Sequence, residues 1–371
     1  MPSGYPTFDQ IRDEILQFVE RHATIARLEA LGESDEGRPV DVVFVTDPAV
    51  PDDDKQVALI VNVRHGDERG TWGIGPALLE MLASPASAEI LRSQTVVVVP
   101  VANPDGCARN EFLAPRDTLS DTELRTIVEL ARRIVPDLVV DIHSLSGYDS
   151  EFVLAAHVAQ EGEDTFIHQA MMARLVGDLA EVGYPFFTSQ VKGGYNNFFC
   201  GLCHEECHPL VFGLEVNHLS LTCDEAAESG GAAVCSLLNW GSARQPWQAQ
   251  PGYPNGILLG NFHTSLRPAG ANASERRSSR AALWRSRAGF SNLKRALVEK
   301  TKVRVTFDYD GEPLESVAQL VCRVRGRLSA VEATLDGSPA RSSMRHEKCS
   351  TYVACELPVV RPGKHELILV F

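Results

Sequence analysis

Residues 61–68 read VNVRHGDE, and the first three of them end an apolar run at residues 57–63. A short, valine-rich run of this kind is typical of a strand buried in a sheet. His65 and Glu68 follow it three residues apart, so in a turn both side chains would lie on one side. An imidazole and a carboxylate placed in this way can bind one cation. The same spacing also occurs in surface turns that hold only a charged pair.

A second apolar run, at residues 138–142, also leads into a histidine, His143. Neighbouring parallel strands bring their carboxyl ends to one edge of a sheet, so we expect this imidazole near His65 and Glu68. Together the three side chains would supply the three protein ligands typical of catalytic zinc, with one position left for water. Asp141 lies on the same side of its strand as His143 and is either an outer-shell partner of the histidine or a cap.

Glu215 lies inside a third apolar segment, FGLEVNH at residues 212–218. A carboxylate among apolar residues is costly to bury without a partner. Beside a metal-activated water it would act as the general base. The alternative is a glutamate at the exposed end of a strand.

The wider pattern predicts an α/β fold with a mainly parallel, mixed sheet flanked by helices. Short apolar runs alternate with longer amphipathic segments, as in sheets that are covered on both faces. The expected strands are residues 41–46, 57–63, 95–100, 138–142, 152–155 and 210–216. The expected helices are residues 72–82, 119–135 and 165–181, and residues 8–30 carry apolar side chains at helical spacing.

The distribution of charge divides the chain near residue 240. Residues 241–371 contain 20 Lys+Arg and 11 Asp+Glu, a net charge of +9, whereas residues 1–240 have a net charge of −23. We predict a catalytic domain at residues 1–240, a linker or extension rich in Arg, Pro and Gly at 241–300, and a small β-sandwich at 301–371. Val303, Val305 and Phe307 alternate with polar residues there, as expected of half-buried strands.

Composition also bears on partners and compartment. The acidic catalytic part would repel phosphates, so nucleic acid is not expected as a substrate. No apolar stretch is long enough to cross a membrane, and the N-terminus has no secretory pattern, so we expect a cytoplasmic protein that does not bind membranes. The nine cysteines are an odd number and are interpreted mostly as reduced thiols.

A dense group of soft ligands, CGLCHEECH, occupies residues 200–208. Cys200, Cys203 and Cys207 could hold a structural zinc ion. A disulfide, or simple loop residues near the substrate, are the alternatives, and we favour a single catalytic zinc.

Six motifs in order resemble the zinc carboxypeptidase (carboxypeptidase A-like) family across residues 5–240. They are GESDEGRP at residues 32–39, HGDE at 65–68, NPDG at 103–106, SDTE at 120–123, DIHS at 141–144 and GLE at 213–215. The resemblance implies that zinc on His65, Glu68 and His143 activates water. It also implies that Glu215 takes a proton from that water and passes it to the leaving amine.

The same resemblance suggests the residues that bind substrate. The interval after the NPDG motif is short here, and Arg109 and Asn110 are the best matches to the family's arginine and asparagine for the oxyanion and the terminal carboxylate, with Arg116 as a further candidate. Tyr195 is the candidate for the family's mobile tyrosine, which would close over the substrate, and a packing tyrosine is the alternative. Asp67 departs from the arginine of digestive-type members, so a small amide substrate with a free carboxylate is as suitable as a large peptide.

We therefore predict a zinc hydrolase that cleaves an amide bond next to a free carboxylate in a small peptide or peptide-like substrate. One alternative is a deacylase that removes an acyl or amino-acid group from an N-acyl amino acid. Another is an inactive module that binds peptides. The sequence does not define the subunit count.

Overall fold

A computed structural model gives the fold of the 371-residue chain. It describes residues 4–52, 55–112, 122–145, 152–157, 163–184, 187–192, 199, 203, 209–217, 221–242, 246–248, 257–259, 264–268, 290–299, 301–311, 313–347 and 350–371. The chain divides into two compact units. One comprises most of residues 1–239, and the other comprises residues 240–371 with the short stretches 53–55 and 161–170.

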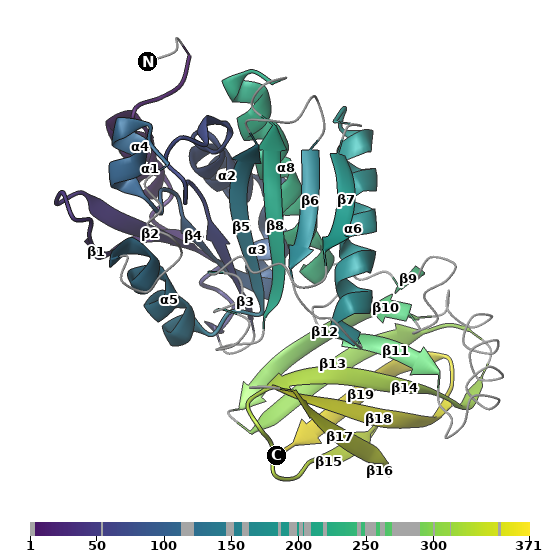
Figure 1. The fold of residues 1–371 in the computed structure, drawn as a ribbon. Helices are drawn as coiled ribbons and strands as arrows, with labels where there is room; N and C mark the ends of the chain where they lie inside the picture. Colours follow the sequence, from purple (N-terminus) through teal and green to yellow (C-terminus); the bar gives the residue numbers. More distant parts are fainter. Residues whose placement is uncertain are drawn as a thin grey trace. The chain divides into compact units, whose positions relative to one another are not determined.

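The first unit is built on an eight-stranded mixed sheet with the order β1-β2-β4-β3-β5-β8-β6-β7 (Figure 1). Strands β3, β4, β5 and β8 at its centre run parallel to one another. The strands are β1 (Ala26–Glu33), β2 (Pro39–Val45), β3 (Gln56–Val61), β4 (Gln94–Val99), β5 (Leu138–Leu145), β6 (Phe152–His157), β7 (Phe187–Lys192) and β8 (Leu210–Asn217).

Helices cover both faces of this sheet, α5 on one side and α2, α3 and α8 on the other (Figure 1). Residues of α5 share one buried cluster with Leu59, Val97 and Val139 of the central strands, which are buried on both faces. The helices are α1 (Phe8–Arg21), α2 (Ile74–Ala83), α3 (Ala88–Ser93), α4 (Pro104–Arg109), α5 (Thr122–Ile134), α6 (Glu163–Glu181) and α8 (Cys223–Ser242). The predicted α/β class is confirmed.

One expected element is wrong in its second half. The apolar spacing of residues 8–30 predicted a helix, but α1 ends at Arg21 and β1 begins at Ala26. Turn residues 22–25 end the helix, and β1 then forms an antiparallel pair with β2. Ala26, Leu28 and Ala30 alternate there with Arg27 and Glu29, which is the period of a strand and not of a helix.

The second unit contains two antiparallel sheets around one core. Val305 and Phe307 from one sheet share a buried cluster with Leu320, Cys322 and other side chains from the second sheet. The strands are β9 (Pro246–Gln248), β10 (Ile257–Leu259), β11 (Thr264–Pro268), β12 (Phe290–Glu299), β13 (Lys302–Tyr309), β14 (Leu314–Arg325), β15 (Glu332–Leu335), β16 (Ser338–Ala340), β17 (Ser342–Glu347), β18 (Ser350–Val360) and β19 (Gly363–Val370). Burial alternates along β13, as the sequence predicts.

The stretch expected to be a linker, residues 241–300, contributes four of these strands. Of these, β11 pairs with β14, and β12 pairs with β13, so this stretch takes part in both sheets. Strands β9 and β10 have three residues each, which is too few for an alternating pattern to be recognised in a sequence.

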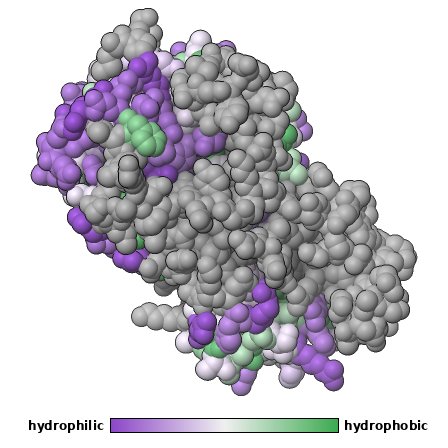
Figure 2. All heavy atoms as spheres, viewed as in Figure 1, coloured by the Kyte–Doolittle hydropathy of each residue, from purple (hydrophilic) through white to green (hydrophobic). Residues whose placement is uncertain are grey.

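Two further features concern the surface and the thiols of the described residues. Figure 2 shows mainly hydrophilic side chains over the N-terminal elements on the face in view. Within the described ranges, no helix has the length and apolar character needed to span a membrane. Among the described residues, no disulfide joins Cys107, Cys203, Cys223, Cys235, Cys322 and Cys355 to one another.

Candidate metal centre

The loop that follows β3 is held in an unusual backbone conformation. Val63 has a φ of 51°, in the left-handed region that β-branched residues rarely adopt. Such a conformation costs on the order of 1–3 kcal/mol and persists only where the surroundings enforce it. Here the carbonyl of Val63 accepts a hydrogen bond from the backbone N–H of Asn103 at 3.0 Å, and Asn62 donates to the carbonyls of Thr71 and Pro100. The loop is therefore fixed before it reaches His65.

A close backbone contact completes this support. A Cβ added to Gly66 would lie 1.9 Å from the carbonyl carbon of Gly106, so only glycine fits between the two loops. The carbonyl of Gly66 also accepts a hydrogen bond from the indole of Trp72 at 3.2 Å. The HGDE and NPDG motifs thus meet backbone to backbone.

Replacing Gly66 by alanine should destabilise the protein by at least about 1–3 kcal/mol, because two backbones must move apart. Gly177→Ala is the matched control, since nothing lies within 4 Å of its added Cβ on the exposed face of α6. That helical substitution should stabilise the protein by about 0.5–1 kcal/mol. Urea unfolding measures both, and equal effects of the two changes would contradict the tight contact.

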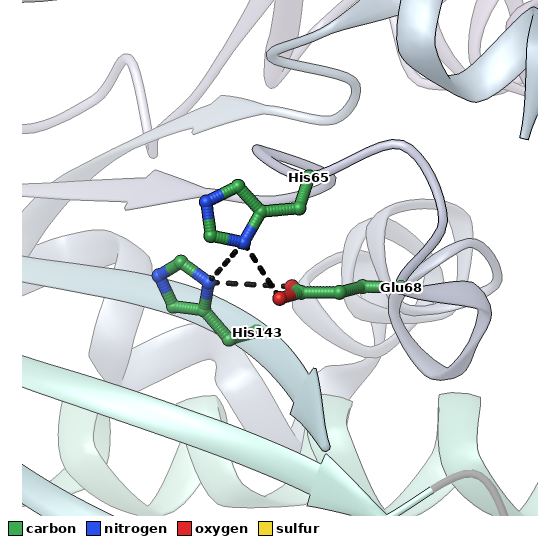
Figure 3. A group of neighbouring side chains, drawn as sticks. All are labelled: His65, Glu68 and His143. Carbon is green, nitrogen blue, oxygen red and sulfur yellow. Dashed lines mark hydrogen bonds and ion pairs between the residues drawn. The ribbon is translucent and has the colours of Figure 1, made fainter. Parts of the chain in front are cut away.

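Three side chains converge at the carboxyl ends of β3 and β5 (Figure 3). His65 Nδ1 lies 2.6 Å from Glu68 Oε1, and His143 Nδ1 lies 3.2 Å from Glu68 Oε2. The two Nδ1 atoms are 3.3 Å apart. Glu68 is oriented by the backbone N–H of Ser144, which donates to Oε2 at 3.1 Å. The sequence predicted this convergence from strand ends alone.

The second nitrogen of His143 is bound by a buried carboxylate. His143 Nε2 lies 2.8 Å from Asp141 Oδ2, and Asp141 is fully buried. A carboxylate on one ring nitrogen fixes the tautomer and leaves the other nitrogen with its lone pair. Of the two roles considered for Asp141, the structure therefore favours the outer-shell partner.

The charges of the cluster favour an ionised Glu68. Burial alone would raise its pKa, but His143 and His65 lower the pKa of Glu68 to about 2. Burial likewise opposes the charge of His143, whose pKa is nonetheless raised well above its usual value by Asp141 and Glu68. The carboxylates around His143 therefore stabilise a positive charge at this cluster.

These donors suit zinc. One ligand atom from each of His65, Glu68 and His143 lies within 4.8 Å of the others, which makes the three a candidate metal site within the described part of the chain. Two imidazole nitrogens and one carboxylate oxygen are donors that zinc accepts in catalytic sites. The residues therefore fit the ion that the sequence predicted.

Glu215 lies beside this cluster. It is the register partner of His143 on the adjacent parallel strand, so both side chains project from the same face of the sheet. Burial, opposed by His143, raises the pKa of Glu215 to about 7. A carboxyl with a pKa near neutrality can both accept and return a proton.

The structure places the two substrate-binding candidates at the end of α4, Arg109 and its C-cap Asn110, differently. The guanidinium of Arg109 forms an ion pair with Glu36 of the β1–β2 hairpin. The side chain of Asn110 accepts a hydrogen bond at 2.6 Å from Nε of Arg69, the residue that follows Glu68. Sequence reasoning missed Arg69, although its position next to a predicted ligand was a signal.

The hairpin motif and the NPDG motif form one network. Asp105 is buried and accepts hydrogen bonds from Ser34 at 2.7 Å, from the backbone N–H of Glu36 at 3.0 Å and from Arg38 at 2.6 Å. This network explains why the two distant motifs occur together. It fixes the hairpin against the start of α4, next to the ligand loop.

The aromatic ring of Phe112 packs beside the cluster. Its ring centroid lies 4.4 Å from that of His65, yet 55% of the residue is exposed. An exposed aromatic ring against a ligand histidine is available for contact with a bound molecule.

Several predicted residues fall outside the described residues. They are Arg116, Tyr195, Cys200 and Cys207. Cys203 is described, and its side chain is buried in the cluster beneath α5. The roles of these residues stay predictions.

Comparisons with known proteins give a match to one family profile and similarity to several solved folds. The sequence profile described as "Zinc carboxypeptidase" matches residues 11–122. No curated protein matches the sequence significantly. The structure is similar to a metallo-carboxypeptidase from Burkholderia cenocepacia at 17% identity, with a TM-score of 0.52 and coverage of 62% of this chain and 68% of that one.

Two further solved structures have the same fold. Carboxypeptidase A from Helicoverpa armigera is 12% identical, with a TM-score of 0.53 and coverage of 63% of this chain and 72% of the other. A metallo-carboxypeptidase from Pseudomonas aeruginosa, solved with (2-guanidinoethylmercapto)succinic acid, is 20% identical, with a TM-score of 0.50 and coverage of 61% and 68%. The resemblance to zinc carboxypeptidases, and the carboxypeptidase-like fold with separate antiparallel sheets at the C-terminus, are confirmed.

Proposed function

We propose that this chain is a zinc-dependent hydrolase that cleaves an amide bond next to a free carboxylate in a small peptide or peptide-like substrate. The convergence of His65, Glu68 and His143 beside Glu215 is the observation that carries the proposal. Resemblance to zinc carboxypeptidases over residues 11–122 supports the same chemistry.

The three ligand candidates would hold zinc, which supplies a Lewis acid that polarises a carbonyl and makes water acidic. The protein itself orients the donors. Asp141 binds Nε2 of His143 and leaves Nδ1 to bind the ion, and the backbone N–H of Ser144 donates to one oxygen of Glu68. These contacts hold the site in one geometry before substrate binds, which reduces the cost of reorganisation.

Glu215 is proposed to move the proton. Its partly buried carboxylate would accept a proton from the attacking water and deliver it to the nitrogen of the leaving amine. The pKa of about 7 supports this role, because a base matched to the working pH transfers protons efficiently in both directions.

We propose that the substrate carboxylate binds near Arg69 and Asn110. The two side chains are joined by the 2.6 Å hydrogen bond, and Arg69 directly follows Glu68 in the chain. A planar guanidinium that uses Nε for this bond can still present other N–H groups to a carboxylate. Arg109 and Arg116 remain candidates for the oxyanion, and Tyr195 for closing over the substrate.

A substrate panel tests the proposal. We expect the zinc-loaded protein to hydrolyse small peptides with a free C-terminal carboxylate, and to hydrolyse their C-terminal amides about 10–100-fold more slowly, because a charged hydrogen bond worth about 1.5–3 kcal/mol is lost. N-acyl amino acids are assayed beside them. Turnover confined to N-acyl amino acids would assign the deacylase instead, and no turnover of any member would leave only a binding module.

A further inference from the structure

Arg64 is a buried cation that the proposed chemistry does not use. The residue is 8% exposed, and its Nε lies 3.4 Å from Oδ2 of Asp141. That same oxygen lies 2.8 Å from Nε2 of His143. One carboxylate oxygen thus lies between a permanent cation and the outer nitrogen of a ligand imidazole.

Arg64 and His65 reach opposite ends of His143. Nδ1 of His65 approaches Nδ1 of His143 at 3.3 Å, on the side of Glu68. Arg64 reaches the Nε2 side through Asp141. Two consecutive residues of the strained ligand loop are therefore linked to the two sides of the third ligand, His65 directly and Arg64 through Asp141.

Asp141 needs such a partner because no water reaches it. A fully buried carboxylate is stable only when it is paired and hydrogen-bonded. Burial by itself would raise its pKa, but His143 and Arg64 hold the pKa of Asp141 far below its usual range. When His143 donates to a metal it carries no net charge, so Arg64 is then the cation nearest to this carboxylate among its described partners.

We propose that Arg64 is a positioning residue that holds Asp141 in the orientation that aims Nδ1 of His143 at the metal. The inference rests on the proposed zinc site and adds a residue to it. In this role Arg64 acts through Asp141 and is not itself a metal ligand.

Whether the removal of Arg64 weakens or tightens zinc binding distinguishes a positioning role from simple charge repulsion. Arg64 is a cation near the site, so its removal should tighten binding of a divalent cation if only through-space repulsion mattered. Loss of an outer-shell partner, in contrast, typically weakens metal affinity by about 10–100-fold. A weaker site after removal of a positive charge therefore identifies positioning.

A double-mutant cycle provides the test. Zinc dissociation constants are measured by chelator competition for the wild type, Arg64→Met, Asp141→Asn and the double variant. We expect Arg64→Met to weaken zinc binding about 10–100-fold when Asp141 is present, and not to weaken it in the Asp141→Asn background. Unchanged or tighter binding with Asp141 present, or equal weakening in both backgrounds, would overturn the inference.

Two more variants separate a specific effect on zinc binding from a general loss of stability. Arg12→Met removes the arginine partner of another buried carboxylate, Asp41 at 2.9 Å, and should lower stability without changing zinc affinity. Arg64→Lys keeps the charge without the planar fork and should bind zinc with intermediate affinity. If Arg64→Met does not fold, wild-type affinity in Arg64→Lys overturns the inference.

The wild type separates this inference from the proposed function. A wild-type chain that binds no zinc overturns both. A wild-type chain that binds one zinc ion, with Arg64 variants of equal affinity, overturns only the positioning role. The cobalt-substituted proteins give an independent readout, because a displaced imidazole changes the visible absorption of the ion whatever the activity.

Discussion

Replacing Glu215 by glutamine should lower kcat/KM by about 10²–10⁴-fold while zinc stays bound. Glutamine has nearly the same shape but cannot accept a proton from water. The variant should fold, since a neutral amide replaces a carboxyl whose burial already disfavours its charge. Steady-state kinetics with a small peptide and metal analysis of the same preparation provide the two measurements.

Glu228→Gln is the control for this experiment. Glu228 is an exposed residue of α8 that accepts a hydrogen bond from Tyr184 at 2.9 Å. Its replacement removes one carboxylate of the same unit and should leave kcat/KM unchanged. Activity retained by Glu215→Gln at the wild-type level would exclude this residue as the base.

Replacing His65 by glutamine should weaken zinc binding by more than about 100-fold, beyond the range typical of outer-shell changes. One of three protein donors is lost, and the remaining His143 and Glu68 cannot complete the set. Chelator competition measures the dissociation constant, and the activity at limiting zinc should fall in parallel.

His22→Gln is the matched control. His22 also lies near a glutamate, with Nε2 3.9 Å from Glu80, but it caps the end of α1 away from the ligand loop. Zinc affinity should not change in this variant. A His65 variant that binds zinc as tightly as the His22 variant would show that the ion is held elsewhere.

Much of the fold could be predicted because its central strands are buried on both faces. The runs VVVV at residues 96–99 of β4 and LVV at residues 138–140 of β5 can be recognised from the sequence alone, since consecutive apolar residues are typical of strands buried on both faces. Helix α8 was not expected, because Gly230 and Gly231 interrupt it. Those glycines fit closely against Ile74 and Met81 of α2, a packing reason that the local sequence does not carry.

The sequence could predict those site residues that lie directly after the ends of buried strands. His65, Glu68 and His143 are placed by the ends of two parallel strands, and their types match a known set of zinc donors. The contact between Arg64 and Asp141, and that between Arg69 and Asn110, depend on which loops become neighbours. A single sequence contains no pattern for such contacts, so the roles of these arginines were missed, although Arg69 directly follows a predicted ligand.

The central claim is that one zinc ion binds between His65, Glu68 and His143. Anomalous diffraction at the zinc edge, collected on crystals of the zinc-loaded protein, tests it most directly. We expect one strong peak that lies about 2.0–2.1 Å from both Nδ1 atoms and about 2.0–2.2 Å from a Glu68 oxygen. A zinc peak at another site, with no peak among these three side chains, would contradict it.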